Sequence, residues 1–127
     1  MEQLNRRDTG SVRIPFISGS NTPLAGAYGI GLDASGNTYV ANFSNSDILA
    51  FDGTNGNIPP NRTIGGSNTQ ISGPEGLAVH GNSIYLTNVY NNSVTVYATS
   101  ASGNVAPTAV ISGSNTQLVA PTSVTVH

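Results

Sequence analysis

The sequence contains no cysteine, no lysine and few charged residues of either sign. The absence of cysteine excludes disulfides, thiolate zinc sites and cysteine nucleophiles, and it leaves the redox compartment undetermined. Only 8% of the 127 residues are charged, and the formal net charge is −2. Four cations cannot neutralise a run of phosphates, so a nucleic-acid binder is not expected. No apolar run approaches a membrane span, and 37% hydrophobic residues are enough for a buried core.

What the chain does contain is an internal repeat. ISGSNT begins at Ile17, IGGSNT begins at Ile64 and ISGSNT returns at Ile111, so each start lies 47 residues after the one before. The similarity extends beyond these letters, because TYVAN is matched by IYLTN and DILAF by SVTVY. Repeats of about 40 to 50 residues are typical of stacked arrays and propeller blades.

Each period predicts four short β-strands separated by Gly, Asn and Ser turns. The expected strands are 28–33, 38–43, 47–52 and 62–65 in the first repeat, and 75–80, 84–89, 93–98 and 109–112 in the second. A strand of the fourth type is expected near 12–18, and one of the first type at 123–127. The 15 Gly and 7 Pro disfavour helix. Residues 1–8 are the one candidate for a short helix, with a frayed tail as the equal alternative.

The first strand of each repeat carries large residues on one face and small residues on the other. Ile30 and Leu32 alternate with Gly29 and Gly31, and the sequences GLAVH and SVTVH repeat this alternation. Large therefore meets small between neighbouring sheets, which is what radially packed sheets need in order to fill space without voids. In the third strand both faces are partly apolar, with Ile48 and Ala50 opposite Leu49 and Phe51, as expected of a sheet covered on both sides. Tyr39 with Tyr85, and Phe51 with Tyr97, recur and are expected in the core.

From about residue 17 to 127 the repeats resemble NHL-type β-propeller blades. The resemblance is carried by YGIGLDASGNTYVANFSNSDILAF and EGLAVHGNSIYLTNVYNNSVTVY, although Asp47 and Ser93 stand where the family has a basic residue. It implies an all-β fold of two four-stranded propeller blades plus flanking strands, incomplete as a single chain. Its members are mostly recognition or scaffold propellers, and a related branch contains metal-dependent lactonases and lyases.

We expect one repeat domain over residues 12–127, preceded by an N-terminal tail at 1–11. A closed propeller has about 4 to 8 blades, so two repeats leave apolar blade faces without a neighbour. We therefore expect a homo-oligomer through these faces, with a piece of a longer propeller as the alternative. Residues 17–33 and 111–127 fill the same slot of the period, which fits a truncated gene, an excised fragment or a strand-exchanging oligomer.

Two sets of residues are weighed as metal ligands. Asp33, His80 and His127 occupy equivalent positions, but equivalent positions on adjacent sheets lie about 10 Å apart, too far to share one ion. These residues are interpreted as polar closures of a turn. The resemblance to the lactonase branch offers Glu75, Asn42, Asn88 and Asp33 as a set that could imitate a calcium or zinc site. Because the two asparagines recur in both repeats, a structural role for them is favoured, and no metal or cofactor is predicted.

Nucleophilic catalysis is not expected either. The two histidines stand alone, no Gly-x-Ser-x-Gly elbow is present, and the glycine-rich stretches lack the lysine of a phosphate-binding loop. The recurring Gly-Ser-Asn stretches are interpreted as loops between blades, held by Asn and Ser hydrogen bonds to the backbone. The unrepeated Tyr28, Glu75 and Tyr90 are the candidate ligand-binding residues, because tyrosines beside Asn and Glu can stack on a sugar or a peptide.

The sequence thus predicts a non-enzymatic binding or scaffold module that acts within an assembled or larger propeller. The alternative is a fragment or subunit of a metal-dependent lyase or lactonase-type propeller. A composition rich in Asn, Ser, Thr and Gly suits a bacterial exported protein, but residues 1–9 lack the apolar core of a signal peptide.

Overall fold

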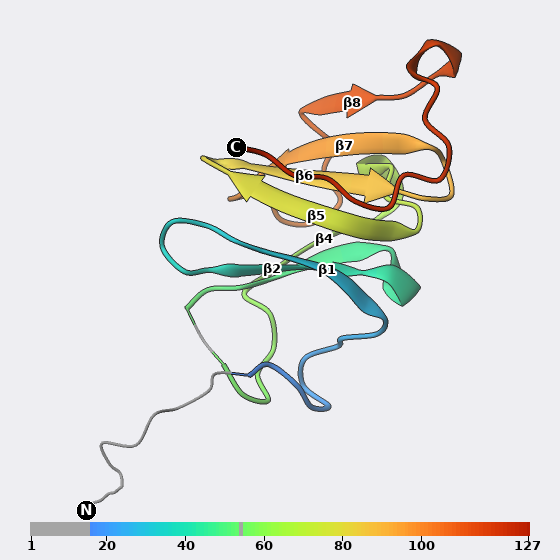
Figure 1. The fold of residues 1–127 in the computed structure, drawn as a ribbon. Coiled ribbons are helices and arrows are strands. Elements are labelled where there is room, and N and C mark those ends of the chain that lie inside the picture. The colour runs from blue at the N-terminus through green and yellow to red at the C-terminus, as the bar shows by residue number, and fades with distance from the viewer. Residues whose placement is uncertain (1–15, 54) are drawn as a thin grey trace, which may run out of the picture.

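A computed structural model describes residues 16–53 and 55–127 and contains two four-stranded antiparallel sheets (Figure 1). The first sheet has the strand order β1-β2-β3-β4, and the second has the order β5-β6-β7-β8. The strands are β1 (Ala27–Leu32), β2 (Thr38–Asn42), β3 (Asp47–Phe51), β4 (Arg62–Gly65), β5 (Pro74–His80), β6 (Ser83–Asn88), β7 (Ser93–Ala98) and β8 (Ala109–Ile111). Three 3-10 turns accompany them: η1 (Phe43–Asn45), η2 (Ser67–Thr69) and η3 (Ser114–Thr116).

All eight strands of the two repeats are confirmed, with bounds that differ from the prediction by one residue at most. The all-β class is therefore established for the described part of the chain. The expected tail at 1–11 and the short helix at 1–8 lie outside the described residues. So does most of the strand expected at 12–18, of which Ile17 forms an isolated parallel bridge with Gly56.

The two sheets stack face to face, with β1 of the first sheet packed on β5 of the second (Figure 1). The predicted contact of large with small residues is found here. A Cβ atom added to Gly31 would lie 2.7 Å from Leu77 Cδ2 and 3.0 Å from Val79 Cγ2, and one added to Gly29 would overlap the carbonyl oxygen of Glu75. These glycines are therefore required by close approach, since any side chain would push the two sheets apart.

The same contact recurs one period later, between β5 and the end of the chain. A Cβ atom added to Gly76 would lie 2.7 Å from the carbonyl oxygen of Thr122 and 2.6 Å from Ser123 Cα. Gly76 follows Gly29 by 47 residues, and Thr122 follows Glu75 by 47 residues, so the C-terminal segment packs on the second sheet as β5 packs on the first. Figure 1 shows this segment running along the second sheet.

The strand expected at 123–127 is not formed, and this prediction was wrong in that respect. Residues 119–127 have no assigned strand, although Val124 and Val126 are partly buried and alternate with the exposed Thr125 and His127. The alternation is that of an extended chain, but a strand needs a hydrogen-bonded neighbour. In the described residues this segment has the packing of a first strand without a second strand beside it.

The core confirms three of the four recurring aromatic residues. Tyr39, Phe51 and Tyr97 are fully buried, whereas Tyr85 is only partly buried. Tyr39 lies on the face of the first sheet that the second sheet covers, in a cluster with Leu77 and residues of both sheets. Tyr85 occupies the same position in the second sheet, where the C-terminal segment, not a further sheet, packs on the corresponding face among the described residues. The third strand is buried on both faces, as predicted.

The loop that precedes the first strand of each sheet is held by the same contacts in both repeats. Asn57 Oδ1 accepts a hydrogen bond of 2.7 Å from Asn21 N, and Asn104 Oδ1 accepts one of 2.7 Å from Asn68 N. The hydroxyl that holds each loop is that of a threonine, not of the predicted serine. Its Oγ1 donates to a glycine carbonyl three residues earlier and accepts from the amide two residues later, in the turns of Thr22, Thr69 and Thr116.

Candidate functional site

Three aromatic side chains meet at one edge of the stacked sheets. The ring centroids of Tyr28 and Phe43 are 4.8 Å apart, and those of Phe43 and Tyr90 are 5.5 Å apart. Both pairs adopt the tilted and edge-to-face geometries that aromatic rings prefer. Tyr28 is 62% exposed and Tyr90 is 69% exposed, while Phe43 between them is partly buried. We call Tyr28, Phe43 and Tyr90 the aromatic cluster.

Backbone hydrogen bonds fix the first two members of the cluster. Phe43 begins η1, immediately after β2, and its amide donates to the carbonyl oxygen of Gly26 at 2.9 Å. The next amide, that of Ser44, donates to the carbonyl oxygen of Ala25 at 3.0 Å. These bonds anchor η1 beside the start of β1, the strand that carries Tyr28.

Tyr90 is positioned by the second sheet. It lies in the turn after β6, and its amide donates to the carbonyl oxygen of Ser72 at 3.2 Å. Its ring covers Gly73, where an added Cβ atom would lie 2.8 Å from Cδ2 of the tyrosine. Because Gly73 has a φ of +64°, both its backbone and its contact with the ring favour glycine.

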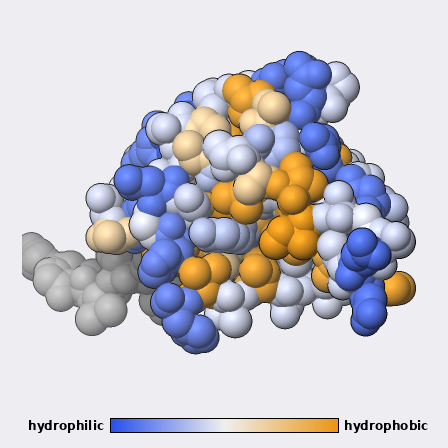
Figure 2. Space-filling view, turned by 90° about the horizontal axis from the view of Figure 1, so that it is seen from above, coloured by the Kyte–Doolittle hydropathy of each residue, from blue (hydrophilic) through white to orange (hydrophobic). Residues whose placement is uncertain are grey.

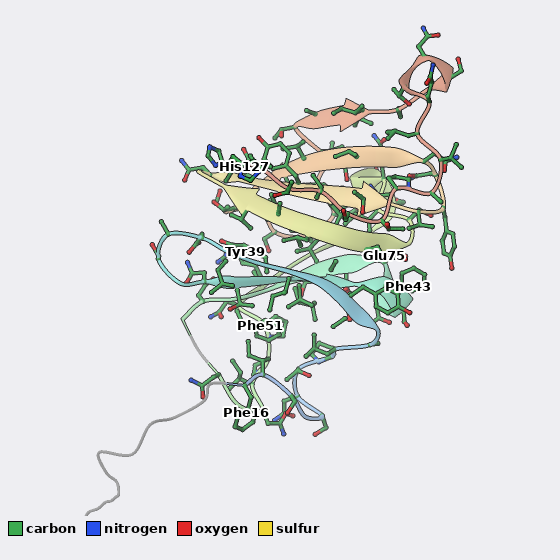
Figure 3. The ribbon with its side chains drawn as sticks, viewed as in Figure 1. Phe16, Tyr39, Phe43, Phe51, Glu75 and His127 are labelled. Carbon is green, nitrogen blue, oxygen red and sulfur yellow. The ribbon has the colours of Figure 1, made fainter. Side chains whose placement is uncertain are left out.

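Glu75 lies at the same edge of the stacked sheets as the aromatic cluster, and Figure 3 shows its side chain near that of Phe43. It is partly buried in β5, and its carbonyl oxygen faces Gly29, the neighbour of Tyr28 in the chain. Phe43 therefore contacts both Tyr28 and Tyr90, and Glu75 lies at the same edge of the stacked sheets. Sequence reasoning missed Phe43, although a signal was present: its counterpart in the second repeat is Val89, so it too is an unrepeated aromatic residue.

A second feature is an open groove of about 630 Å³ on the free face of the first sheet. Its wall is mostly apolar and includes Phe16, Leu24, Tyr28, Ile30, Leu32 and Val40. Tyr28 contributes to both the groove and the aromatic cluster. The residues of its wall include no Asp, Glu, His, Lys or Arg, and the mostly apolar side chains offer hydrophobic contact to a ligand.

Asp33, predicted to close a turn, does so. Its Oδ1 accepts hydrogen bonds of 2.9 Å from the amides of Ser35 and Asn37, and its Oδ2 accepts from Asn37 Nδ2 at 2.9 Å and Tyr39 Oη at 3.0 Å. The hydrogen bond from the Asn37 amide is the main reason why the pKa of Asp33 is below its usual value. His80 and His127 are exposed.

Asn42 and Asn88 also have the structural role that their recurrence suggested. Asn42 Oδ1 accepts a hydrogen bond of 2.6 Å from the amide of Ala25, and Asn88 Oδ1 accepts one of 3.0 Å from the amide of Ser72. Both side chains are fully buried, so they tie the loop before each first strand to the end of the second strand. Their carbonyl oxygens are occupied by these amides and do not point to a shared site with Glu75.

Within residues 16–53 and 55–127, no group of three His, Cys, Asp or Glu side chains is arranged to hold a metal ion. No helix in this part of the chain is both long and apolar enough to cross a bilayer. The sequence matches no protein-family model and no curated protein. The geometry of the residues themselves therefore has to carry any functional conclusion.

Proposed function

We propose that this protein is a non-enzymatic binding module, and that the aromatic cluster contacts its ligand. The observation that carries the proposal is the contact of Tyr28, Phe43 and Tyr90 at the surface, with Glu75 at the same edge of the stacked sheets. Two of these rings are more than half exposed, and aromatic rings held at the surface are typical contacts for sugar rings and for peptide side chains. A carboxylate at the same end supplies a hydrogen-bond acceptor for a hydroxyl or an amide.

We further propose that the two sheets are blades of a β-propeller-type array of the NHL kind. The support is the recurrence of one stacking contact, since Gly29 packs on Glu75 as Gly76 packs on Thr122. The parallel bridges recur as well, between Ile17 and Gly56 and between Ile64 and Gly103. A unit that repeats both its internal hydrogen bonds and its contact with the next unit is built for continuation. In this arrangement the sheets act as a scaffold that positions the aromatic cluster.

The binding proposal is tested by probing the 127-residue chain against an array of neutral oligosaccharides and a library of synthetic peptides. We expect binding to members of one class, and we expect Tyr90→Ala and Tyr28→Ala each to weaken that binding by about tenfold. Ser102→Ala is the control, because Ser102 is an exposed loop residue outside the cluster. Binding that both tyrosine variants retain, or no binding in either collection, would contradict the proposal.

The alternative is a lyase or lactonase-type metalloenzyme, and no contact in the described residues favours it. The asparagine oxygens that it would need accept backbone hydrogen bonds. Its test is a titration with Ca²⁺ and Zn²⁺, read from the melting temperature.

A further inference from the structure

In the described part of the chain, the exposed large hydrophobic residues other than Tyr90 and Val110 lie at the two ends of the stack. At the free face of the first sheet, Ile30 is 63% exposed and Leu32 is 59% exposed, and Phe16 and Tyr28 lie beside them in the groove. At the opposite end, Ile111 of β8 and Val119 of the C-terminal segment are exposed, whereas Val110, the neighbour of Ile111 in β8, points to the other face of the sheet. Figure 2, which looks onto this second end, shows hydrophobic surface in its centre. We call these two surfaces the first face and the last face.

Among the described residues, the open part of the first face runs along β1. The outward side chains of β2 and β3, namely Val40, Leu49 and Phe51, are buried under Ile17, Leu24 and Ile58. Ile30 and Leu32 of β1 have no such cover among the described residues. A single extended segment would be enough to cover what remains.

We infer that the first face of one copy binds the C-terminal segment of a second copy, head to tail. Ile30 and Leu32 then pack on the exposed Ser123 and Thr125 of the neighbour, as Leu77 packs on Gly31 within one chain. The inference deepens the proposed array, on which it rests, by naming the partner and the contacting residues. The chain carries both halves of this contact, one at each end of its stack.

The size of the residues selects head-to-tail over face-to-face association. Ile30 and Leu32 correspond to Leu77 and Val79, which fit against a strand whose facing residues are glycines. Ser123 and Thr125 are the small residues of the C-terminal segment and point away from the second sheet, because the alternate Val124 and Val126 are partly buried. Two first faces together would place large residues against large ones and leave voids, which close packing disfavours.

The geometry is tested by blocking each face separately and mixing the blocked chains. Ile30→Asp/Leu32→Asp closes the first face, and Ser123→Asp/Thr125→Asp closes the last face with charges of the same sign. We expect the unmodified chain to associate with rising concentration in light scattering, and each variant alone to remain a monomer. An equimolar mixture of the two variants restores association but stops at two chains, because only one intact contact remains between them.

Ser100→Asp/Ser102→Asp, at two exposed loop residues, controls for added charge and is expected to associate like the unmodified chain. All four side chains substituted in the blocking variants are exposed, and a melting temperature within a few degrees of that of the unmodified chain verifies that the variants fold. The inference is overturned if the unmodified chain is a monomer at all concentrations. It is also overturned if the last-face variant dimerises alone, or if the mixture stays monomeric.

These outcomes are separate from those of the binding proposal. If the chain is a monomer but binds a ligand through Tyr90, the binding proposal stands and the head-to-tail inference fails. If the chain associates head to tail but binds no sugar or peptide, the inference stands and the binding proposal fails. Association is read from mass, and ligand binding is read from the array.

Discussion

At the scale of single residues, Tyr97 carries the most perturbed ionisation in the described part of the chain. Its side chain is 1% exposed, and its hydroxyl donates to the carbonyl oxygen of Thr69 at 2.5 Å and lies 3.0 Å from Thr95 Oγ1. Burial raises the pKa of Tyr97 from 10.0 to about 12, because the phenolate would lose its hydration. The neutral form is therefore preferred in the folded state.

This pKa sets the direction of an alkaline transition. A pKa that is higher in the folded than in the unfolded state contributes stability that is fully present below pH 10 and is lost as the pH rises towards 12. The shift of this pKa changes the free energy of unfolding by at most about 3 kcal/mol. We expect Tyr97→Phe to cost about 1 to 2 kcal/mol at pH 7, through the lost hydrogen bonds, and to lose stability less steeply than the unmodified chain above pH 10.

The measurement is urea unfolding at pH 7, 9, 10 and 11, with the exposed Tyr90→Phe as the control that removes a surface hydroxyl. If Tyr97→Phe and the unmodified chain lose stability in parallel above pH 10, then the buried hydroxyl of Tyr97 is not the titrating group. Tyr39, whose pKa is also raised by burial, would then be the next candidate.

The residues of the candidate site show which side chains the sequence could identify. Tyr28 and Tyr90 were identifiable because they break the repeat, and the same criterion applied to Phe43 would have completed the cluster. Their proximity was not predictable, because it depends on η1 being tied to Ala25 and Gly26 and on the turn after β6 packing over Gly73. Such contacts join positions far apart in the sequence, and no periodicity encodes them.

At the scale of the elements, the ends of β2 and β6 are stabilised by equivalent asparagines in different surroundings. Asn42 Nδ2 donates to Asp47 Oδ1 at 2.9 Å, whereas Asn88 Nδ2 donates to the hydroxyls of Ser93 and Thr95 at 3.3 and 3.0 Å. Burial raises the pKa of Asp47, and the hydrogen bond from Asn42 partly opposes this. One strand end therefore contains a carboxylate that the other lacks.

The difference predicts unequal effects of the same substitution. Asn42→Asp places a second carboxylate against Asp47, while Asn88→Asp leaves hydroxyls that can donate to the new oxygen. We expect Asn42→Asp to be the more destabilising at pH 7 by about 2 kcal/mol, because it sets a fully buried carboxylate beside the partly buried carboxylate of Asp47. As the pH falls, the carboxylates bind protons and their repulsion weakens. The difference in stability between the two variants therefore narrows towards pH 4.

Thermal and urea unfolding of the two variants at pH 7 and pH 4 measure this difference, and Asn42→Ala and Asn88→Ala control for the loss of the amide itself. Equal destabilisation by both aspartates at pH 7, or a gap that widens in acid, would show that Asn42 and Asp47 do not interact as described.

The strands themselves were the most predictable elements. Alternation with a period of two and the Gly-Asn turns set their positions, and the 47-residue repeat allowed each strand to support the assignment of its counterpart. The segment at 123–127 shows where this reasoning ends. Its sequence has the pattern of a first strand, but strand formation depends on a neighbour to pair with, and the described chain supplies none.

At the scale of the whole molecule, one hydrophobic core joins the two sheets. The cluster that contains Tyr39, Ala41 and Ile48 of the first sheet also contains Leu77, Leu86 and Tyr97 of the second. Separation of the sheets would expose all of these side chains together, so we expect a single cooperative unfolding transition. Because the transition involves the whole stack, its midpoint reports ligand binding at any folded site.

That midpoint distinguishes the binding module from the metalloenzyme alternative. A calcium or zinc site built on Glu75, Asn42, Asn88 and Asp33 would need oxygens that already accept hydrogen bonds, from Ala25 and Ser72 for the asparagines and from the 33–37 turn for Asp33. We therefore expect the melting temperature to be the same in EDTA, in millimolar Ca²⁺ and in Zn²⁺. A metal held at a hundred times its dissociation constant would instead raise it by about 10 °C. A saturating increase of that size, abolished by Glu75→Gln and retained in Tyr90→Ala, would favour the metalloenzyme and place its ion away from the aromatic cluster.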